Sequence, residues 1–343
     1  MTGIDVHRVE EGRPDLLDVL VAVRAVTDQE LNPGDPPPSA AELAGDLFAG
    51  WTRERRQAWV ATLDGDPVGE LTFRIDDAEE NRHRVDAEWL AVVPRARRRG
   101  VADALLRAGL DVAGAEGRTS VTFGVPATLD GAGVAYAARL GATKRMEERC
   151  SRLRVCDIPW DVVHRWRDEG RTRTDGYRLV QWIGRVPDEH LDLMVAVQRA
   201  MEDMPTDELD WSIPTMGEDD VRSFDEAAEA RGLVPIATAA VSPTGEPAAF
   251  SVLFASRHRP VLGWQGDTGV LAEHRGHGLG RWLKAENLEH ALGTEPRIEV
   301  VETYNAESNP WMLEINVAMG FRPHVGYEAW QAEVATVRAV LGA

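Results

Sequence analysis

A pattern of strand, glycine turn and helix occurs twice in this chain of 343 residues. In WLAVVPRARRRGVADALLRAG (89–109) and in DTGVLAEHRGHGLGRWLKAENL (267–288), an apolar run leads through a short turn into a helical pattern of apolar residues. Three matched pairs share one offset of 178 positions, namely Arg97 and Arg275, Gly100 and Gly278, and Ala102 and Gly280. A repeat of about one domain's length predicts a tandem duplication.

The sequences that flank the two copies are also alike. Each half begins with a strand, IDVHRV or YRLVQWI, and then has two amphipathic helices, which we expect at 14–30 and 39–50 and again at 187–202 and 218–231. Two strand patterns joined by a turn, DGDP or SPTG, precede each repeat, and a strand, a helix and a strand follow it. Both halves therefore read β-α-α-β-β-β-α-β-α-β, which predicts mixed, mostly antiparallel α/β domains.

The predicted domain boundaries follow from this order. We expect an N-terminal domain at 1–155, a linker at 156–175 that could contain a short helix, and a C-terminal domain at 176–343. At this length, two domains are also the ordinary expectation.

Charge and composition exclude several functional classes. A net charge of −19 and a pI near 4.9 disfavour nucleic acid and anionic membranes as partners, because both would repel the chain. The sequence has no continuous apolar run of membrane-spanning length and no signal-peptide pattern at its start. Two cysteines are too few for a disulfide framework. We expect a cytoplasmic protein, either a monomer or a homodimer.

The glycine turns predict an anion site. A strand that delivers glycines to a helix start exposes backbone N–H groups and the positive end of the helix dipole, which suit a phosphate or pyrophosphate. The spacing matches neither a P-loop nor a dinucleotide fingerprint. Arg95, Arg97, Arg98 and Arg99 could neutralise phosphates or form a solvated basic face, and either turn could be a tight connection without a ligand. His274 and His277 lack a third nearby ligand, so no metal is expected.

The pattern Arg/Gln-x-x-Gly-x-Gly/Ala, together with the element order, resembles the GNAT superfamily of acyl-CoA-dependent N-acetyltransferases. The resemblance covers nearly the whole chain, and the tandem layout is similar to that of mycothiol synthase. It implies acetyl-CoA as cosubstrate, with the pyrophosphate on the turns. The residues implied in CoA binding are Val270, Leu271, Arg275, Gly276, Gly278, Gly280 and Asn309 in the second half and Val92, Arg97, Arg98, Gly100 and Ala102 in the first.

The same resemblance suggests catalytic residues. Attack by a neutral amine on a thioester needs a base, for which Asp267 is the candidate, with Glu273 behind it and Glu88 as its counterpart in the first half. The family's usual tyrosine acid, four residues before Gly320, is replaced by Asn316, which can hydrogen-bond to sulfur but cannot act as the acid.

Other aromatic residues are candidates for the missing acid. Tyr304 and Tyr327 are the nearest replacements in the second half. In the first half, Asp130 stands where the asparagine is expected, and Tyr136 is one place off the tyrosine position. We therefore expect the C-terminal domain to be catalytic and the N-terminal domain to be degenerate or supporting.

Three functions remain open. The first is an N-acetyltransferase for a small-molecule amine or a peptide. An acidic loop around Trp211 (MEDMPTDELDWSIPTM) could hold a cationic acceptor, or it could be a polar surface loop. The second is a non-catalytic acyl-CoA-binding tandem module. The third is a structural duplication in which the N-terminal domain serves as a subunit interface.

Overall fold

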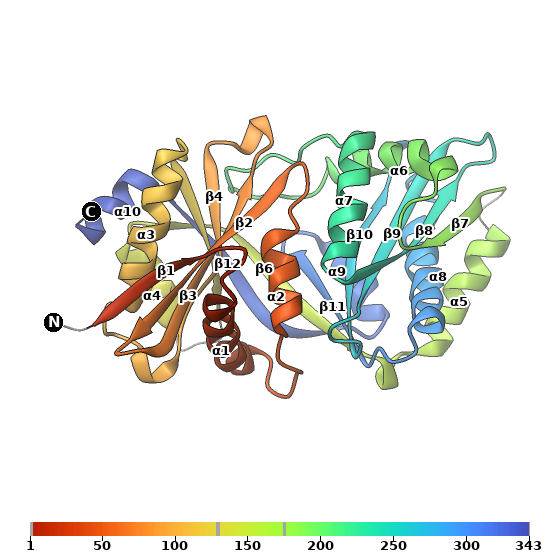
Figure 1. The fold of residues 1–343 in the computed structure, drawn as a ribbon. Helices are drawn as coiled ribbons and strands as arrows, with labels where there is room; N and C mark the ends of the chain where they lie inside the picture. The colour runs from red at the N-terminus through yellow and green to blue at the C-terminus, as the bar shows by residue number, and fades with distance from the viewer. Residues whose placement is uncertain (1–2, 128–130, 174–175, 343) are drawn as a thin grey trace. The chain divides into compact units, whose positions relative to one another are not determined.

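A computed structural model describes residues 3–127, 131–173 and 176–342 of the chain (Figure 1). The chain divides into two compact units. The N-terminal unit consists of Met1–Glu147, Asp207–Ser212 and Val325–Ala343, and the C-terminal unit consists of Glu148–Thr206 and Ile213–His324. Each unit is built around six neighbouring strands of β-sheet.

The N-terminal unit has a mixed sheet with one parallel pair. Its strands are β1 (Ile4–Val9), β2 (Glu54–Leu63), β3 (Asp66–Asp76), β4 (Arg84–Val92), β5 (Ser120–Pro126) and the part of β12 (Arg322–Glu333) from Val325 onward. They are ordered β1-β2-β3-β4-β5-β12, and only β4 and β5 are parallel. Its helices are α1 (Pro14–Leu31), α2 (Ala40–Phe48), α3 (Val101–Ala115), α4 (Ala132–Arg139) and α10 (Val334–Leu341), with short 3-10 helices η1 (Glu79–Asn81) and η2 (Pro94–Ala96).

The C-terminal unit repeats this topology. Its strands are β7 (Arg178–Ile183), β8 (Leu233–Val241), β9 (Pro247–Ser256), β10 (Leu262–Val270), β11 (Val300–Ala306) and the part of β6 (Thr143–Arg154) from Glu148 onward. They are ordered β7-β8-β9-β10-β11-β6, and only β10 and β11 are parallel. Its helices are α5 (Trp160–Arg173), α6 (Leu191–Gln198), α7 (Glu218–Ala230), α8 (Leu279–Thr294) and α9 (Pro310–Ala318), with 3-10 helices η3 (Val155–Asp157), η4 (Asp188–His190), η5 (Arg199–Met201) and η6 (Ala272–His274).

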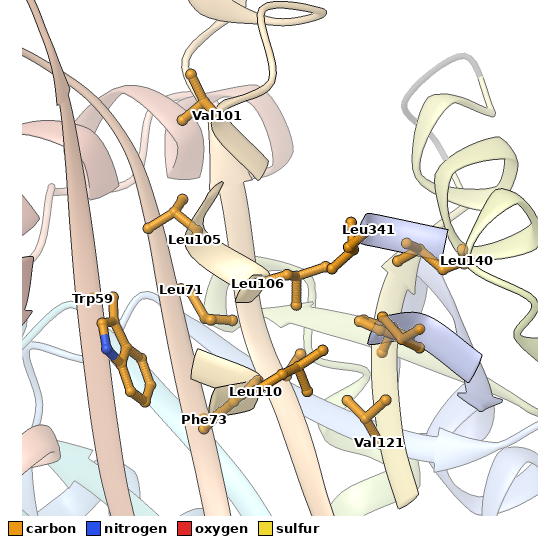
Figure 2. Close-up of a cluster of buried hydrophobic side chains, with 14 of the residues drawn as sticks. Trp59, Leu71, Phe73, Val101, Leu105, Leu106, Leu110, Val121, Leu140 and Leu341 are labelled. Atoms are coloured by element: carbon orange, nitrogen blue, oxygen red, sulfur yellow. The ribbon is translucent and has the colours of Figure 1, made fainter. Parts of the chain in front are cut away.

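Strand alternation builds the core of the N-terminal unit. In β2, Ala58 and Val60 pack on α1 and α2, while Trp59 belongs to the larger cluster on the other face. In that cluster, Leu106 and Leu110 of α3 are fully buried with apolar side chains of the central strands (Figure 2). The interior beneath this first glycine turn is therefore built mainly from apolar side chains.

The C-terminal sheet is also covered on both faces. Val197 of α6 and Val221 of α7 join Phe250 in a cluster on one face, while α5 and α8 contribute to the cluster on the other. Helix α5 approaches α8 closely, because a Cβ added to Gly170 would lie 2.1 Å from the Trp282 ring. No helix among the described residues is long and apolar enough to span a membrane.

The expected mixed α/β class and element order are confirmed. The compact units differ from the expected ranges 1–155 and 176–343 in their last strands. Residues 148–154 of β6 pair with β11, and residues 327–333 of β12 pair with β5. The segment 156–175 contains α5, which packs on α8 rather than forming a free linker. Helix α10 was not expected.

Candidate active site

The two glycine turns have the same backbone path. After β10, η6 leads to Arg275, and Gly276 and Gly278 follow with φ of +83° and +77°. After β4, η2 leads to Arg97, and Gly100 has φ of +85°. Arg98, at the position equivalent to Gly276, also has a positive φ, of +61°. The first copy therefore holds a non-glycine residue in the left-handed region, which costs about 1–2 kcal/mol.

Both turns leave backbone accessible at a helix start. A Cβ added to Gly100, Gly276 or Gly278 would meet no atom within 4 Å. At Gly280 a Cβ would make ordinary contacts of 3.8 Å, so the alanine at position 102 of the other copy is equally suitable. Neither α3 nor α8 has a side-chain cap at its N-terminus. An anion at either turn would therefore meet uncapped N–H groups.

The paired arginines brace their turns. Arg97 Nε donates to the carbonyl of Val92 at 3.0 Å, and Arg275 Nε donates to the carbonyl of Val270 at 3.1 Å. Their outer nitrogens form ion pairs, Arg97 with Glu30 and Arg275 with Asp203. Both guanidinium groups are thus directed at protein atoms. A phosphate at either turn would therefore bind to the backbone N–H groups of the turn rather than to these arginines.

The parallel strands of the C-terminal unit stop pairing part-way along. Only Leu262–Trp264 of β10 pair with Val300–Glu302 of β11, and the β10–β9 register shifts between Gln265 and Thr268. This shift is a β-bulge, a device that re-aims the strand beside many active sites. The β10 backbone beyond it is unpaired toward β11 among the described residues.

The two predicted backbone donors differ. Leu271 N–H donates to Ala248 O at 2.9 Å, so that group is already used. Because N–H groups alternate in direction along a strand, Val270 N–H points toward the unpaired edge. Of the two, Val270 remains the candidate. The first unit follows the same rule, since Val93 N–H donates to Val68 O at 2.9 Å.

The carboxylates at the two bulges have opposite environments. Asp267 has no ion pair within the described residues, and burial raises its pKa although its side chain still reaches solvent. Glu88 accepts two hydrogen bonds from Arg56, at 2.7 and 2.9 Å. Burial opposes its ionisation, but Arg56 and the more distant Arg74 and Arg24 lower the pKa of Glu88 to about 2. The pKa of Asp267 is raised and that of Glu88 is lowered, so the two carboxylates are not in equivalent environments.

The predicted catalytic side chains occupy different faces of the C-terminal sheet. A Cβ on Gly269 would contact Ala200 and Met201, so by alternation Asp267 also faces the α6 side. Tyr304 is 43% exposed and, by the same alternation, faces away from the buried Thr303. Asn316 of α9 is 2% exposed, and its Nδ2 donates to Asn305 Oδ1 at 2.7 Å. The three are not one cluster.

Several other expected residues have structural partners. Asn309 caps α9, because its side chain accepts a hydrogen bond from Met312 N at 3.2 Å. Tyr327 pairs with Pro126 and belongs to the N-terminal unit. Tyr136 OH donates to Asp103 at 2.8 Å, and burial together with that carboxylate raises the pKa of Tyr136. Asp130 lies outside the described residues.

The acidic loop is largely held in place within the N-terminal unit. Its segment Asp207–Ser212 belongs to that unit, where Asp210 lies 2.8 Å from His83 and Glu208 lies 3.3 Å from Arg145. Asp203 of the same loop pairs with Arg275, so three of its five acids already have basic partners, which weakens its proposed role as a cation-binding loop.

Sequence reasoning missed Lys284, which is only 1% exposed on α8. A lysine in an amphipathic helix is ordinarily assigned to the surface, so its burial had no obvious sequence signal beyond its match to Leu106 at the 178-residue offset. No group of three or more His, Cys, Asp or Glu residues in the described part of the chain is placed to hold a metal ion.

Comparisons with known proteins agree with this architecture. Residues 24–142 match the model of the acetyltransferase (GNAT) family. A tandem GNAT protein from the clavulanic acid biosynthesis pathway, solved without acetyl-CoA, is 26% identical with a TM-score of 0.77 over 96% of this chain and 98% of that one. Residues 24–142 thus match the GNAT family, and the whole chain has the fold of a tandem GNAT protein. No match is found among curated proteins.

A GCN5-related N-acetyltransferase from Sphaerobacter thermophilus shares the fold of this chain, at 15% identity and a TM-score of 0.69 over 96% of each chain. The family model, in contrast, covers only the first half. The matched family sequence thus lies in the N-terminal unit, whereas the carboxylate without an ion pair among the described residues, Asp267, lies in the C-terminal unit.

Proposed function

We propose that this protein transfers an acetyl group from acetyl-CoA to a primary amine, with the C-terminal unit as the catalytic one. The observation that carries the proposal is Asp267. It combines a bulge position, access to solvent, a raised pKa and no ion-pair partner within the described residues. Its nearest counterpart, Glu88, is held ionised by Arg56 and cannot take up a proton near neutral pH.

The rest of the C-terminal site supports this assignment. The uncapped turn at Gly276 and Gly278 would receive the CoA pyrophosphate. The unpaired edge of β10 would hydrogen-bond the pantetheine arm, with Val270 N–H as one donor. Asp267 would take the proton from the attacking amine, directly or through a water, in a ternary complex of both substrates.

Two aromatic side chains favour a cationic or amine-bearing acceptor. Trp264 is 45% exposed and stacks on Phe254 with ring centroids 5.0 Å apart, and it lies on the strand that carries Asp267. Tyr304, also exposed, lies on the adjacent strand and on the face that Asp267 occupies. Exposed aromatic faces attract ammonium and amine groups. Either a small amine or a peptide amine fits this chemistry.

A supporting role is proposed for the N-terminal unit. Its turn has the same geometry, but Glu88 and Tyr136 are both engaged in internal pairs. Such a unit could bind CoA without turning it over.

One observation favours a second function, an acyl-CoA-binding tandem module without catalysis. Asn316 stands at the position of the family's acid and has no titratable proton. Binding of acetyl-CoA without transfer to any amine would support this alternative.

The function is tested by incubating the protein with acetyl-CoA and primary amines, namely lysine, tyramine, spermidine and a lysine-containing peptide. Release of the CoA thiol is followed by absorbance, and acetylated product by mass spectrometry. Transfer to at least one amine is expected. Acetyl-CoA binding without thiol release would favour the binding module, and no binding of any CoA ester would contradict both functions.

A further inference from the structure

The interior beneath the glycine turn differs in polarity between the units. Strand register identifies the equivalent strand positions, since Leu71 pairs with Leu90 as Ser251 pairs with Thr268, and Arg84 pairs with Ser120 as Leu262 pairs with Val300. On the helices, Leu106 matches Lys284 at the 178-residue offset, and Ala137 and Asn316 each stand four residues before a glycine, Gly141 or Gly320. In the N-terminal unit six such positions are apolar and belong to, or pack against, one core: Leu71, Leu90, Leu106, Phe123, Val125 and Ala137. In the C-terminal unit the same six form a polar layer: Ser251, Thr268, Lys284, Thr303, Asn305 and Asn316. Figure 2 shows part of the apolar set.

Most of the polar layer is internally hydrogen-bonded. Ser251 and Thr268 join their hydroxyls at 2.8 Å, and Asn316 Nδ2 donates to Asn305 Oδ1 at 2.7 Å. Two groups remain. Asn316 Oδ1 is buried without a hydrogen-bond partner. Lys284 is 1% exposed, and burial is the sole cause of its pKa shift, with no contribution from a charged or hydrogen-bonding partner among the described residues. A buried polar group without a partner is costly, so its presence suggests a role.

Lys284 is buried beside an aromatic ring. Its side chain is 1% exposed, and its Nζ lies 5.8 Å from the centre of the Phe321 ring. Burial alone lowers the pKa of Lys284 to about 7.

The charged groups near α8 have other partners or other orientations. Arg167 and Arg171 of α5 pair with Glu286. By strand alternation from Gly269, Asp267 of β10 is on the opposite face of the sheet. His290, further along α8, has a pKa lowered by burial. None of these supplies Lys284 with a counter-charge in the described structure.

Lys284 lies on the α8 side of the sheet, near the point where β10 and β11 stop pairing. It follows Gly280 by four residues and so lies on the same stripe of the helix. A Cβ on Gly280 would be 3.8 Å from both Val270 of β10 and Ile315 of α9. The face of α8 that carries Lys284 is therefore turned toward the unpaired part of β10 and toward α9.

We propose that Lys284 is the general acid of the C-terminal unit, protonating the CoA sulfur as it leaves, directly or through one water. The proposal rests on the function proposed above. The acceptor nitrogen forms the new C–N bond with its lone pair. The C–S bond breaks, and the electron pair of that bond stays on sulfur. Asp267 takes the proton released by the nitrogen, and Lys284 gives a proton to the sulfur. Exchange with solvent then restores both groups, so no further reactant is needed.

The acid–base match favours this transfer. A thiol has an ordinary pKa near 8.5, so an ammonium of pKa about 7 protonates a thiolate downhill, whereas an ordinary lysine near 10.4 does not. The arrangement also places the base and the acid on opposite faces of the sheet, across the point where β10 and β11 stop pairing. Lys284 on α8 thus takes the acid role that a tyrosine on α9 usually has in the family.

The test is the pH dependence of kcat for the full-length protein and for Lys284→Met, with acetyl-CoA and the best amine of the panel above. Wild type should lose kcat above an apparent pKa near 7, because the acid must be protonated. Lys284→Met should lower kcat by about 10²-fold at pH 6.5 and should abolish this alkaline limb, the fall of kcat above pH 7. Its calorimetric Kd for acetyl-CoA should stay within about threefold, since the Lys284 acid acts on the leaving group. Leu106→Met, the matched change in the N-terminal unit, should behave like wild type.

Each other result has a definite meaning. A Lys284→Met protein that keeps the wild-type kcat and the alkaline limb would overturn the proposal and leave the acetyltransferase function standing. A variant that loses acetyl-CoA binding would make Lys284 a binding residue, which also overturns it. Wild-type protein that neither binds acetyl-CoA nor releases thiol would refute the proposed function itself, and this inference with it.

Discussion

The two units share a backbone and differ in what lies beneath it. Their glycine turns have matched dihedral angles, and their arginines make matched hydrogen bonds. Below the turn, one unit packs leucine, phenylalanine and alanine where the other places lysine, threonine and asparagine. Because a buried lysine without a partner destabilises a fold, the difference supports the catalytic role proposed for Lys284.

The largest expected effect is the pH-dependent change in the free energy of unfolding when Lys284 is replaced. The folded-state pKa of Lys284, about 7, is below its ordinary 10.5, so the unfolded chain binds more protons between these values. Wild-type stability should therefore rise as pH increases from about 7 toward 10, with the penalty complete below pH 7. Lys284→Met should be more stable by up to about 5 kcal/mol at pH 6, and the gain should shrink toward pH 10.

Urea unfolding at pH 6, 8 and 9.5, followed by tryptophan fluorescence, measures this difference. Leu106→Met is the matched control and should change stability by less than about 1.5 kcal/mol with no pH dependence. A stability gain that is equal at all three pH values would show that Lys284 does not titrate as described.

The next largest effect is the difference in kcat between variants of the two carboxylates, Asp267 and Glu88. Asp267→Asn should lower kcat by about 10²-fold or more and remove the rise of kcat with pH that a raised pKa produces. Glu88→Gln should leave kcat within about twofold, because Arg56 already fixes that carboxylate as an anion. Steady-state kinetics between pH 5 and 9 compares them, and equal losses in both variants would remove the distinction between the units.

The smallest effect concerns the turn itself. Arg98 occupies the left-handed region where the other copy has Gly276. Arg98→Gly should stabilise the N-terminal unit by up to about 1 kcal/mol, and Gly276→Arg should destabilise the C-terminal unit by a similar amount. Thermal unfolding measures both, and a destabilised Arg98→Gly protein would mean that the Arg98 side chain has a stabilising role that outweighs its strain.

Part of this structure was predictable from sequence and part was not. The repeat at Gly100 and Gly278 predicted the order of elements and the turns, because glycine at a helix start is a local signal. The pairing of β6 with β11 and of β12 with β5 was not predictable, since strand alternation identifies a face but not a partner.

The site was only partly predictable for similar reasons. Asp267 could be proposed from its place at a strand end, whereas the ion pair that removes Glu88 from consideration joins residues 32 apart in sequence. The burial of Lys284 depends on how α8 packs, which periodicity around a charged residue does not reveal.

The most direct test of the account is a calorimetric titration of acetyl-CoA into wild type, Gly278→Glu and the matched Gly100→Glu. Both glycines have positive φ and open space in front of them, so the two substitutions impose similar strain and place the same negative charge at a turn. The account predicts that wild type and Gly100→Glu bind acetyl-CoA and support transfer, while Gly278→Glu loses the C-terminal site and all turnover. Unchanged binding and transfer in Gly278→Glu, with loss of both in Gly100→Glu, would contradict it and assign the chemistry to the N-terminal unit.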